Sequence, residues 1–212
     1  IRNHVCIDFQ SSYYNNVSAL KMLAARTNWV LTSEKNKVSL YTLEENQMLC
    51  FKVETHVAVA AEQVFLLLSD LRRRKAWDHH YQECDVITDS DEDDSVTKRG
   101  KVQDFILLAS RRRPCDSGDP YLIALRSVTL PAYPPTEDYN RGEVLCAGFS
   151  IWEEENTFTK ISYYNQATPG VLPYISTDIA GLSSSFYCTF ASCSAFLEEN
   201  KESLASLPTS TL

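Results

Sequence analysis

The longest periodic stretch of the sequence runs from Ser176 to Asn200, and it narrows most strongly the folds that the chain can adopt. Its apolar side chains recur at steps of three or four residues, which places them on one stripe of a helix. The members of this stripe are Ile179, Leu182, Phe186, Phe190, Cys193 and Leu197. Roughly twenty residues give about 30 Å of helix, enough to cross a whole small domain. The fold must therefore offer this helix a long apolar surface.

The face opposite that stripe carries small hydroxyl side chains, among them Ser183, Ser184, Ser192 and Ser194. A simple surface helix would carry more lysine and glutamate there. We therefore expect the helix to close a cavity of lipid size in a curved sheet. A helix that packs on a solid core requires the same apolar stripe, so both interpretations remain open from this stretch alone.

Alternating and apolar runs between the helical segments predict nine strands. In one of them Leu49, Phe51 and Val53 alternate with more polar residues, as in a half-buried strand. Short polar links between neighbouring runs predict antiparallel hairpins. The predicted strands are Trp29–Thr32, Lys37–Leu43, Met48–Val57, Cys84–Thr88, Ser95–Val102, Phe105–Arg111, Tyr121–Thr129, Glu143–Glu155 and Phe158–Gln166.

Two further helices are predicted, over residues 11–27 and Ala60–Leu71, from apolar positions at helical spacing. The strands cluster between helices instead of alternating with them, which predicts the α+β class with helices to one side of an antiparallel sheet. A length of 212 residues suits one such domain. We assign residues 1–201 to the domain and the polar residues 202–212 to a flexible tail.

The charge balance makes nucleic acid an unexpected partner, because the net charge is −8 and the sequence pI is about 5.0. Two basic clusters, Arg72–Lys75 and Arg111–Arg113, stand out against this acidic background. One hypothesis is transient docking to an anionic membrane, where each basic residue adds about 1 kcal/mol. The alternative is a solvated surface combined with favourable charges at a helix end.

The cysteines indicate a reducing compartment, and we expect a cytoplasmic protein. Seven cysteines are an odd number, they form no C-x-x-C pair, and several lie within apolar runs. The acidic run Asp89–Asp94 lacks the glycine and glutamate of a calcium loop. We therefore expect neither a metal site nor a cofactor.

Motifs of catalysis are absent from the sequence, including G-x-S-x-G, H-E-x-x-H and the P-loop. One candidate acid–base pair remains, formed by Asp78 with His79 or His80. The alternative is a surface turn in which Asp78 binds backbone N–H groups.

The order of elements and three short motifs resemble the START lipid-binding domain over about residues 10–200. The motifs lie at Arg74–Asp78, Arg99–Phe105 and Ser110–Arg113. Three further stretches are similar to the C-terminal domain of cytosolic acyl-coenzyme A thioesterases, which carry two hotdog domains ahead of it. These stretches are Ala19–Arg26, Tyr41–Glu45 and Cys146–Phe149.

The resemblance implies a helix-grip fold, in which a curved nine-stranded antiparallel sheet surrounds a long C-terminal helix and leaves a hydrophobic tunnel for one lipid. In the thioesterase relatives the hotdog domains carry catalysis, and no hotdog segment is present here. We therefore expect a lipid-binding module that regulates, or presents substrate to, the hotdog thioesterase domains of the same parent chain. Two alternatives stay open: the segment hydrolyses acyl-coenzyme A itself, or it is an inert assembly domain.

The expected ligand is a fatty acid or a lysophospholipid-like molecule. Ala109 falls where sterol-carrying relatives place a buried arginine, which disfavours a sterol. Burying twelve methylenes at about 0.8 kcal/mol each contributes up to about 10 kcal/mol before the costs of binding. A lipid site needs an apolar lining with a few fixed polar groups. The predicted walls are Ile123, Leu125, Phe149, Ile151 and Tyr163, the predicted lid is Leu182, Phe186 and Phe190, and the predicted polar contacts are Tyr163, Asn165 and Arg126.

The side of the sheet on which Arg126 lies is left open by the sequence. Arg126 shares a strand face with Leu122 and Ala124, whereas Ile123 and Leu125 lie on the other face. One apolar pair would be exposed unless both faces of the strand are covered.

Overall fold

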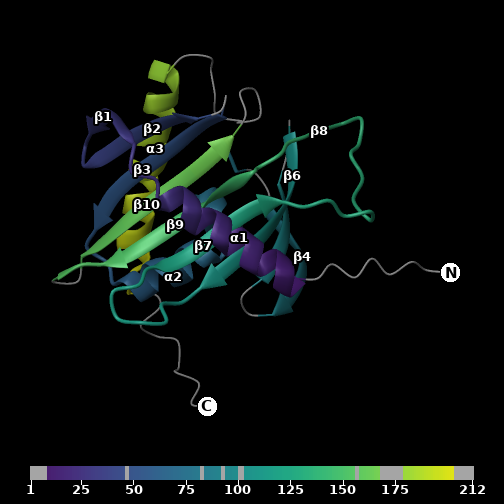
Figure 1. Ribbon diagram of the computed structural model, residues 1–212, viewed down its shortest axis with the longest axis horizontal. Helices are drawn as coiled ribbons and strands as arrows, with labels where there is room; N and C mark the ends of the chain where they lie inside the picture. Colours follow the sequence, from purple (N-terminus) through teal and green to yellow (C-terminus); the bar gives the residue numbers. More distant parts are fainter. Residues whose placement is uncertain are drawn as a thin grey trace, which may run out of the picture.

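Helices lie on both faces of one curved sheet in the computed structural model of this chain. It describes residues 9–202 apart from 46–47, 82–83, 92–93, 100–102, 156–157 and 168–178. The helices are α1 (Phe9–Ala24), α2 (Ala61–Ser69), the short 3-10 helix η1 (Leu71–Ala76) and α3 (Ile179–Asn200). Figure 1 shows the strands fanned between these helices.

The sheet runs in the order β1-β2-β3-β10-β9-β7-β6-β5-β4, and each neighbouring pair on this path is antiparallel. The short β8 pairs with β6 in parallel, outside this path, and was not predicted. The mixed α+β class and the helix-grip arrangement are confirmed. The strands are β1 (Val30–Lys35), β2 (Val38–Glu45), β3 (Met48–Val57), β4 (Cys84–Asp91), β5 (Asp94–Arg99), β6 (Gln103–Arg112), β7 (Tyr121–Ser127), β8 (Asn140–Arg141), β9 (Cys146–Glu153) and β10 (Thr159–Ala167).

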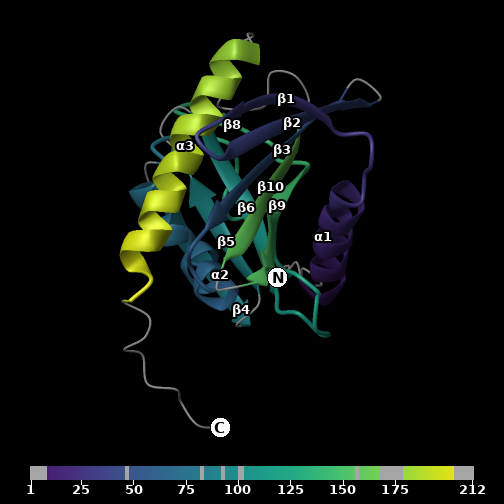
Figure 2. The same ribbon diagram turned by 90° about the vertical axis from the view of Figure 1, so that its left-hand side faces the viewer.

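The two faces of the sheet are covered by different helices, as Figure 2 shows with α3 on one side and α1 on the other. We call the side that α2 and α3 cover the inner face, and the side that α1 covers the outer face. Buried apolar residues under α2 and α3 form the inner cluster, which contains Ile123 together with Phe51, Phe149, Tyr163, Phe186 and Phe190. Leu122 and Ala124 pack with Val17 and Leu20 of α1 in the outer cluster. The prediction that the helices lie to one side is therefore wrong. Covering both faces explains why β7 is apolar on both.

A buried asparagine fixes α1 on the outer face. The side chain of Asn16 is 1% exposed, and its Nδ2 donates to the carbonyl oxygens of Leu108 and Ala124 at 3.3 and 3.0 Å and to Ser110 Oγ at 3.1 Å. These acceptors belong to β6 and β7, so one amide connects the helix to two strands. The contact also aligns the helix so that Val17 and Leu20 pack on the sheet.

Replacing Asn16 by alanine is expected to lower the free energy of unfolding by about 2–3 kcal/mol, because buried carbonyl groups lose their donor. Urea denaturation followed by circular dichroism measures the change. The neighbouring Asn15 is exposed, so Asn15→Ala is the matched control and is expected to change stability by less than about 0.5 kcal/mol. Equal effects of the two substitutions would contradict the anchoring role of Asn16.

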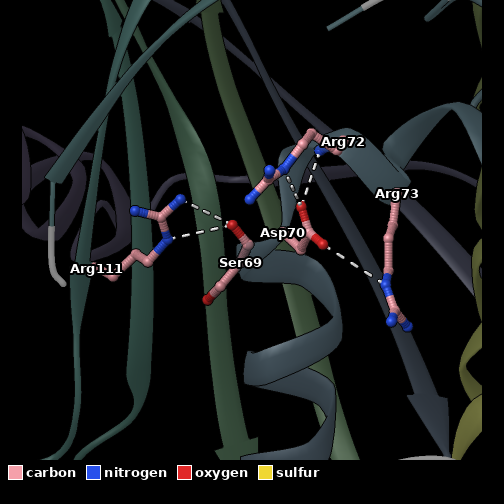
Figure 3. Close-up of polar contacts among 5 residues, drawn as sticks. All are labelled: Ser69, Asp70, Arg72, Arg73 and Arg111. Atoms are coloured by element: carbon pink, nitrogen blue, oxygen red, sulfur yellow. Dashed lines mark hydrogen bonds and ion pairs between the residues drawn. The ribbon is translucent and has the colours of Figure 1, made fainter. Parts of the chain in front are cut away.

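The helix predicted over Ala60–Leu71 ends earlier, at Ser69, because Asp70 starts a new helix. The Asp70 carboxylate accepts from the backbone N–H of Arg72 at 3.2 Å and caps η1. Arg111, from β6, donates through Nε and Nη2 to the carbonyl oxygen of Ser69 at 3.1 and 2.8 Å (Figure 3). This satisfies a carbonyl that the end of α2 leaves without a helical partner.

The two basic clusters also make contacts within the chain. Arg72 and Arg73 lie 3.3 and 3.6 Å from the Asp70 carboxylate (Figure 3), and Arg113 lies 2.7 Å from Glu62. Arg74 is buried with 5% exposure, so its guanidinium is withdrawn from the surface on which membrane docking was hypothesised. No helix within the described residues is both long and apolar enough to cross a bilayer.

Candidate functional site

Aromatic rings from the inner face of the sheet and from α3 meet directly. The ring centroids of Phe149 and Tyr163 are 5.1 Å apart, those of Tyr163 and Phe190 are 5.6 Å apart, and those of Phe51 and Phe186 are 5.5 Å apart. The last two pairs bring Tyr163 of β10 and Phe51 of β3 against the stripe of α3, and the first pair joins β9 to β10 within the sheet. The sequence therefore correctly places the stripe opposite the inner face.

Most of the predicted wall and lid residues share this inner cluster, and a few do not. Ile123, Phe149, Ile151, Tyr163, Phe186 and Phe190 all belong to it. Leu125 lies in an adjoining cluster with Leu71, Ala109 and Ala147. Leu182 lies in α3, but its side chain is outside the part that the structure describes.

The two polar candidates Asn165 and Arg126 lie on opposite faces of the sheet. Asn165 lies on β10 with Nδ2 donating to the hydroxyl of Tyr163 at 3.1 Å, which places it on the inner face. Arg126 shares its face with Leu122 and Ala124, which pack under α1. Arg126 is therefore a half-buried residue of the outer face, and the prediction that it meets a ligand head group inside the fold is corrected.

A buried ion pair between Arg74 and Asp78 lies at the edge of the inner cluster, and the sequence reasoning missed it. Arg74 Nε is 3.1 Å from Asp78 Oδ2, and the side chains are 6% and 1% exposed. The guanidinium carbon lies 4.1 Å from the ring centroid of Tyr81 and 5.2, 5.8 and 5.9 Å from those of Trp77, Tyr163 and Phe149. Aromatic faces stabilise the cation while the carboxylate neutralises it.

The period of the 3-10 helix explains why Arg74 is buried within a basic run. Side chains three residues apart eclipse each other in a 3-10 helix, and Leu71, Arg74 and Trp77 are spaced in this way. All three are buried, whereas Arg72, Arg73 and Lys75 point to solvent. A period of three across Leu71–Trp77 is thus the sequence signal that could have identified Arg74.

The turn after η1 carries the residues proposed as an acid–base pair. Asp78 Oδ1 accepts from the backbone N–H of His80 at 3.2 Å, as expected for a carboxylate that holds a turn. The imidazole Nε2 of His80 is 2.9 Å from Ser185 Oγ on α3. The ring centroids of His79 and His80 are 4.1 Å apart. His80 therefore connects the turn to α3, and Asp78 contacts its main chain.

Buried thiols lie on both faces of the sheet. Cys193 of α3 is fully buried in the inner cluster, and burial raises the pKa of its thiol, with Arg74 lowering and Asp78 raising that pKa. Cys146 belongs to the outer cluster, where burial raises the pKa of its thiol to about 11. Both thiols are therefore neutral at pH 7, which favours their role as apolar packing groups.

The raised pKa of Cys146 predicts a loss of stability at alkaline pH. An unfolded thiol ionises near its ordinary pKa of 9.0, whereas the folded thiol stays neutral up to about pH 11. Stability is therefore complete below pH 9 and falls between pH 9 and 11, by up to about 2–3 kcal/mol. Cys146→Val is expected to remove this part of the pH dependence in urea denaturation, and Cys188→Val, at an exposed position, is expected to retain it.

Comparison with known proteins gives the same fold and a family. The family model of the START domain matches residues 10–171. The structure is similar to human StAR-related lipid transfer protein 5, with a TM-score of 0.77, 16% identity, and coverage of 90% of this chain and 96% of that one. It is also similar to human STARD10, with a TM-score of 0.69, 23% identity, and coverage of 98% and 88%.

Two mouse enzymes are similar in sequence. Acyl-coenzyme A thioesterase 11 is 54% identical over 202 residues, which cover 92% of this chain and 34% of that protein. Acetyl-coenzyme A thioesterase is 42% identical over 190 residues, covering 86% and 34%. The chain thus spans about a third of the length of these relatives. Because the family model matches most of its length, the chain belongs to the START domain family.

Proposed function

We propose that this chain is a lipid-binding module that holds one single-chain fatty acyl lipid, a fatty acid or a lysophospholipid-like molecule, between the inner face and α3. The observation that supports this most is the aromatic and aliphatic cluster shared by the inner face and α3. Such a lining, with few polar groups, is what lipid and other apolar ligand sites require.

Entry of an acyl chain requires the ring contacts between α3 and the sheet to separate. Phe186 and Phe190 contact Phe51 and Tyr163 directly, so the chain must replace these contacts with its own. Each buried methylene contributes about 0.8 kcal/mol, which offsets the loss of ring contacts for a long chain but not for a short one. We therefore propose that affinity rises steeply with acyl chain length.

The head group is proposed to lie beside the Arg74–Asp78 pair, where a polar group meets charged partners inside an apolar cluster. The pair is already compensated, so it offers hydrogen bonds without an unpaired buried charge. The Tyr163 ring neighbours both the guanidinium of Arg74, at 5.8 Å, and the ring of Phe190, at 5.6 Å, so the polar pair adjoins the apolar cluster through this residue.

Binding is tested by native mass spectrometry of delipidated protein with oleate and with oleoyl lysophosphatidylcholine. We expect a complex of one protein and one lipid. Phe190→Trp adds ring atoms where the chain would lie and is expected to weaken binding by about tenfold. The adjacent Ala191 is exposed, and Ala191→Trp is the matched control that is expected to bind normally. Absence of any complex would overturn the proposed function.

We further propose that the module regulates, or presents substrate to, an acyl-coenzyme A thioesterase of the hotdog type in the same parent chain. The support is the similarity to two thioesterases of which this chain matches only about a third. The parent enzyme with and without this segment is assayed on a fixed acyl-coenzyme A while oleate is titrated. A response to oleate that persists without the segment would contradict this role.

The proposal also includes a cellular compartment and a contact with membranes. Five cysteines are free in the described part of the chain, which supports a reducing, cytoplasmic setting. Arg72, Arg73 and Lys75 are exposed on η1 and would supply a transient contact with anionic membrane. Co-sedimentation with vesicles containing phosphatidylserine measures this contact, and glutamine at the three positions is expected to reduce it.

A second candidate function, hydrolysis of acyl-coenzyme A by the segment itself, is favoured by one contact. His80 Nε2 lies 2.9 Å from Ser185 Oγ, within the reach of a base and a nucleophile. Turnover by the isolated chain that disappears in both Ser185→Ala and His80→Ala would establish this function. Equal background rates in the three proteins would exclude it.

A further inference from the structure

Helix α2 carries an exposed leucine on the side that faces away from the inner cluster. Leu66 is 39% exposed. The opposite side of the same helix packs in the inner cluster through Val64, Leu67 and Leu68. A single exposed leucine is common on a protein surface, so the groups around Leu66 decide what it can bind.

Helical spacing places Leu66 between two carboxylates that hold arginines. Glu62 and Asp70 lie four residues before and after Leu66, so the three side chains share one side of α2. Glu62 lies 2.7 Å from the guanidinium of Arg113, and Asp70 contacts the first two arginines of η1 at 3.3 and 3.6 Å. Leu66 therefore has arginines about one helical turn away in both directions.

The two basic clusters of the sequence meet along this helix. Arg111, from β6, donates through Nη2 to the carbonyl oxygen of Ser69 at 2.8 Å, at the C-terminal end of α2. The guanidinium carbon of Arg113 lies 5.2 Å from the ring centroid of Phe65, nearer the start of the helix. Figure 3 shows Arg111 and the two arginines of η1 around the end of α2. Clusters that are separate in sequence therefore form one surface.

We call this region the α2 surface, and its members are Leu66, Arg72, Arg73, Arg111 and Arg113. The side chains of Arg72, Arg73 and Arg113 are 66%, 46% and 52% exposed. Four arginines outnumber the two carboxylates that they contact, although the protein as a whole has a net charge of −8. A positive surface on an acidic protein favours an anionic partner.

A lipid bilayer fits both parts of this surface. The arginines complement anionic head groups, and a bilayer accepts an apolar side chain beside them without a matching pocket. An acidic protein would need a pocket for Leu66. The position of α2 also suits a membrane partner, because the other side of this helix covers the inner face where the lipid is proposed to bind.

We propose that the α2 surface docks on an anionic membrane, with Leu66 inserted between the lipids and the four arginines at the level of their phosphates. This inference rests on the membrane contact included in the proposed function and deepens it, because it adds an apolar insertion and a second basic cluster. Docking in this orientation holds the inner face one helix away from the bilayer.

The test is co-sedimentation of the whole 212-residue chain with vesicles of phosphatidylcholine, with and without phosphatidylserine. We expect binding only when phosphatidylserine is present. Leu66→Ser leaves the charge unchanged and is expected to weaken binding by about tenfold, the effect of losing one inserted leucine. Met22, 67% exposed on α1, provides the matched control, and Met22→Ser is expected to bind normally.

The second basic cluster is tested in the same assay. Arg113→Gln is expected to weaken binding to the phosphatidylserine vesicles by about fivefold. Lys21 is exposed on α1, on the outer face, and Lys21→Gln is the control that is expected to bind normally. Equal effects of the two substitutions would overturn the assignment of Arg113 to the docking surface.

Insertion is measured by quenching with brominated phosphatidylcholine in the same vesicles. Leu66→Trp is expected to add fluorescence that the brominated lipid quenches, whereas the fluorescence added by Met22→Trp is expected to be unaffected. The three native tryptophans are common to both variants, so their signal is subtracted with the wild-type protein.

The outcomes separate this inference from the proposed function. Normal binding by Leu66→Ser together with no quenching in Leu66→Trp overturns the insertion and leaves the contact through η1. Equal binding to vesicles without phosphatidylserine overturns the role of the arginines. Absence of any vesicle binding overturns both membrane proposals, while the complex with oleate in native mass spectrometry still decides lipid binding by the inner face.

Discussion

Replacing Asp78 by alanine is expected to lower the free energy of unfolding by about 3–5 kcal/mol. The substitution leaves the guanidinium of Arg74, whose side chain is 6% exposed, inside the inner cluster without the carboxylate that neutralises it. The aromatic faces around Arg74 stabilise the cation only in part, since a cation–π contact contributes about 0.5–2 kcal/mol. Guanidinium chloride denaturation followed by circular dichroism measures the loss.

Two controls make this prediction specific. Asp70 caps η1 and contacts Arg72 and Arg73 at the surface, and Asp70→Ala is expected to cost about 1–2 kcal/mol through loss of the cap, because the exposed pairs are screened by solvent. The double variant Arg74→Met with Asp78→Leu is expected to recover most of the stability, since an apolar pair leaves no buried charge. A loss in Asp78→Ala no larger than in Asp70→Ala would contradict the burial of the pair.

Replacing Gly148 by alanine is expected to destabilise the fold by about 3–5 kcal/mol, or to prevent folding. The φ angle of Gly148 is +151°, a backbone conformation that residues with a side chain rarely adopt. A Cβ there would lie 2.1 Å from the carbonyl oxygen of Ile123 and 2.9 Å from Leu20 Cδ2. The first clash is with the backbone of β7, which cannot move without disturbing the inner face. Thermal denaturation and yield of soluble protein measure the effect.

Gly118 provides the matched control for backbone strain. Its φ angle is +96°, but a Cβ there meets no atom within 4 Å. Gly118→Ala is therefore expected to cost only the strain of the backbone, about 1–2 kcal/mol. If both glycine substitutions have equal effects, the close approach of β7, β9 and α1 at Gly148 is contradicted.

Periodicity predicted the parts of the fold that depend on local patterns. The stripe of α3 faces the sheet because Phe186, Phe190, Cys193 and Leu197 recur at helical spacing, and all four lie in the inner cluster. The alternation along β3 likewise placed Phe51 and Val53 on one face. These features depend on residues close in sequence, so one chain suffices to find them.

The features that sequence reasoning missed depend on contacts between distant segments. The outer position of α1 requires Asn16 to meet β6 and β7, which lie more than ninety positions further along. The burial of Arg74 depends on a short 3-10 helix, whose period of three was obscured by the surrounding basic residues. The face that Arg126 occupies depends on the helices that cover both sides of β7, and these helices are distant from the strand in sequence.

In the candidate site too, local patterns predicted some features, and others depend on contacts between distant segments. The apolar residues that line the inner face were predictable, because alternation along a strand is enough to assign them to one face. The Asn165 amide donates to the Tyr163 hydroxyl two residues away on the same face of β10, whereas the contact of the Tyr163 ring with Phe190 depends on how β10 packs against α3.

Lipid binding between the inner face and α3 is tested most directly by photo-crosslinking. A fatty acid with a diazirine on its acyl chain is bound to the delipidated protein, irradiated, and mapped by peptide mass spectrometry. We expect crosslinks on inner-face and α3 residues such as Phe149, Tyr163 and Phe190. Crosslinks confined to outer-face residues such as Leu20 and Tyr164, or no crosslinks at all, would contradict the proposed site.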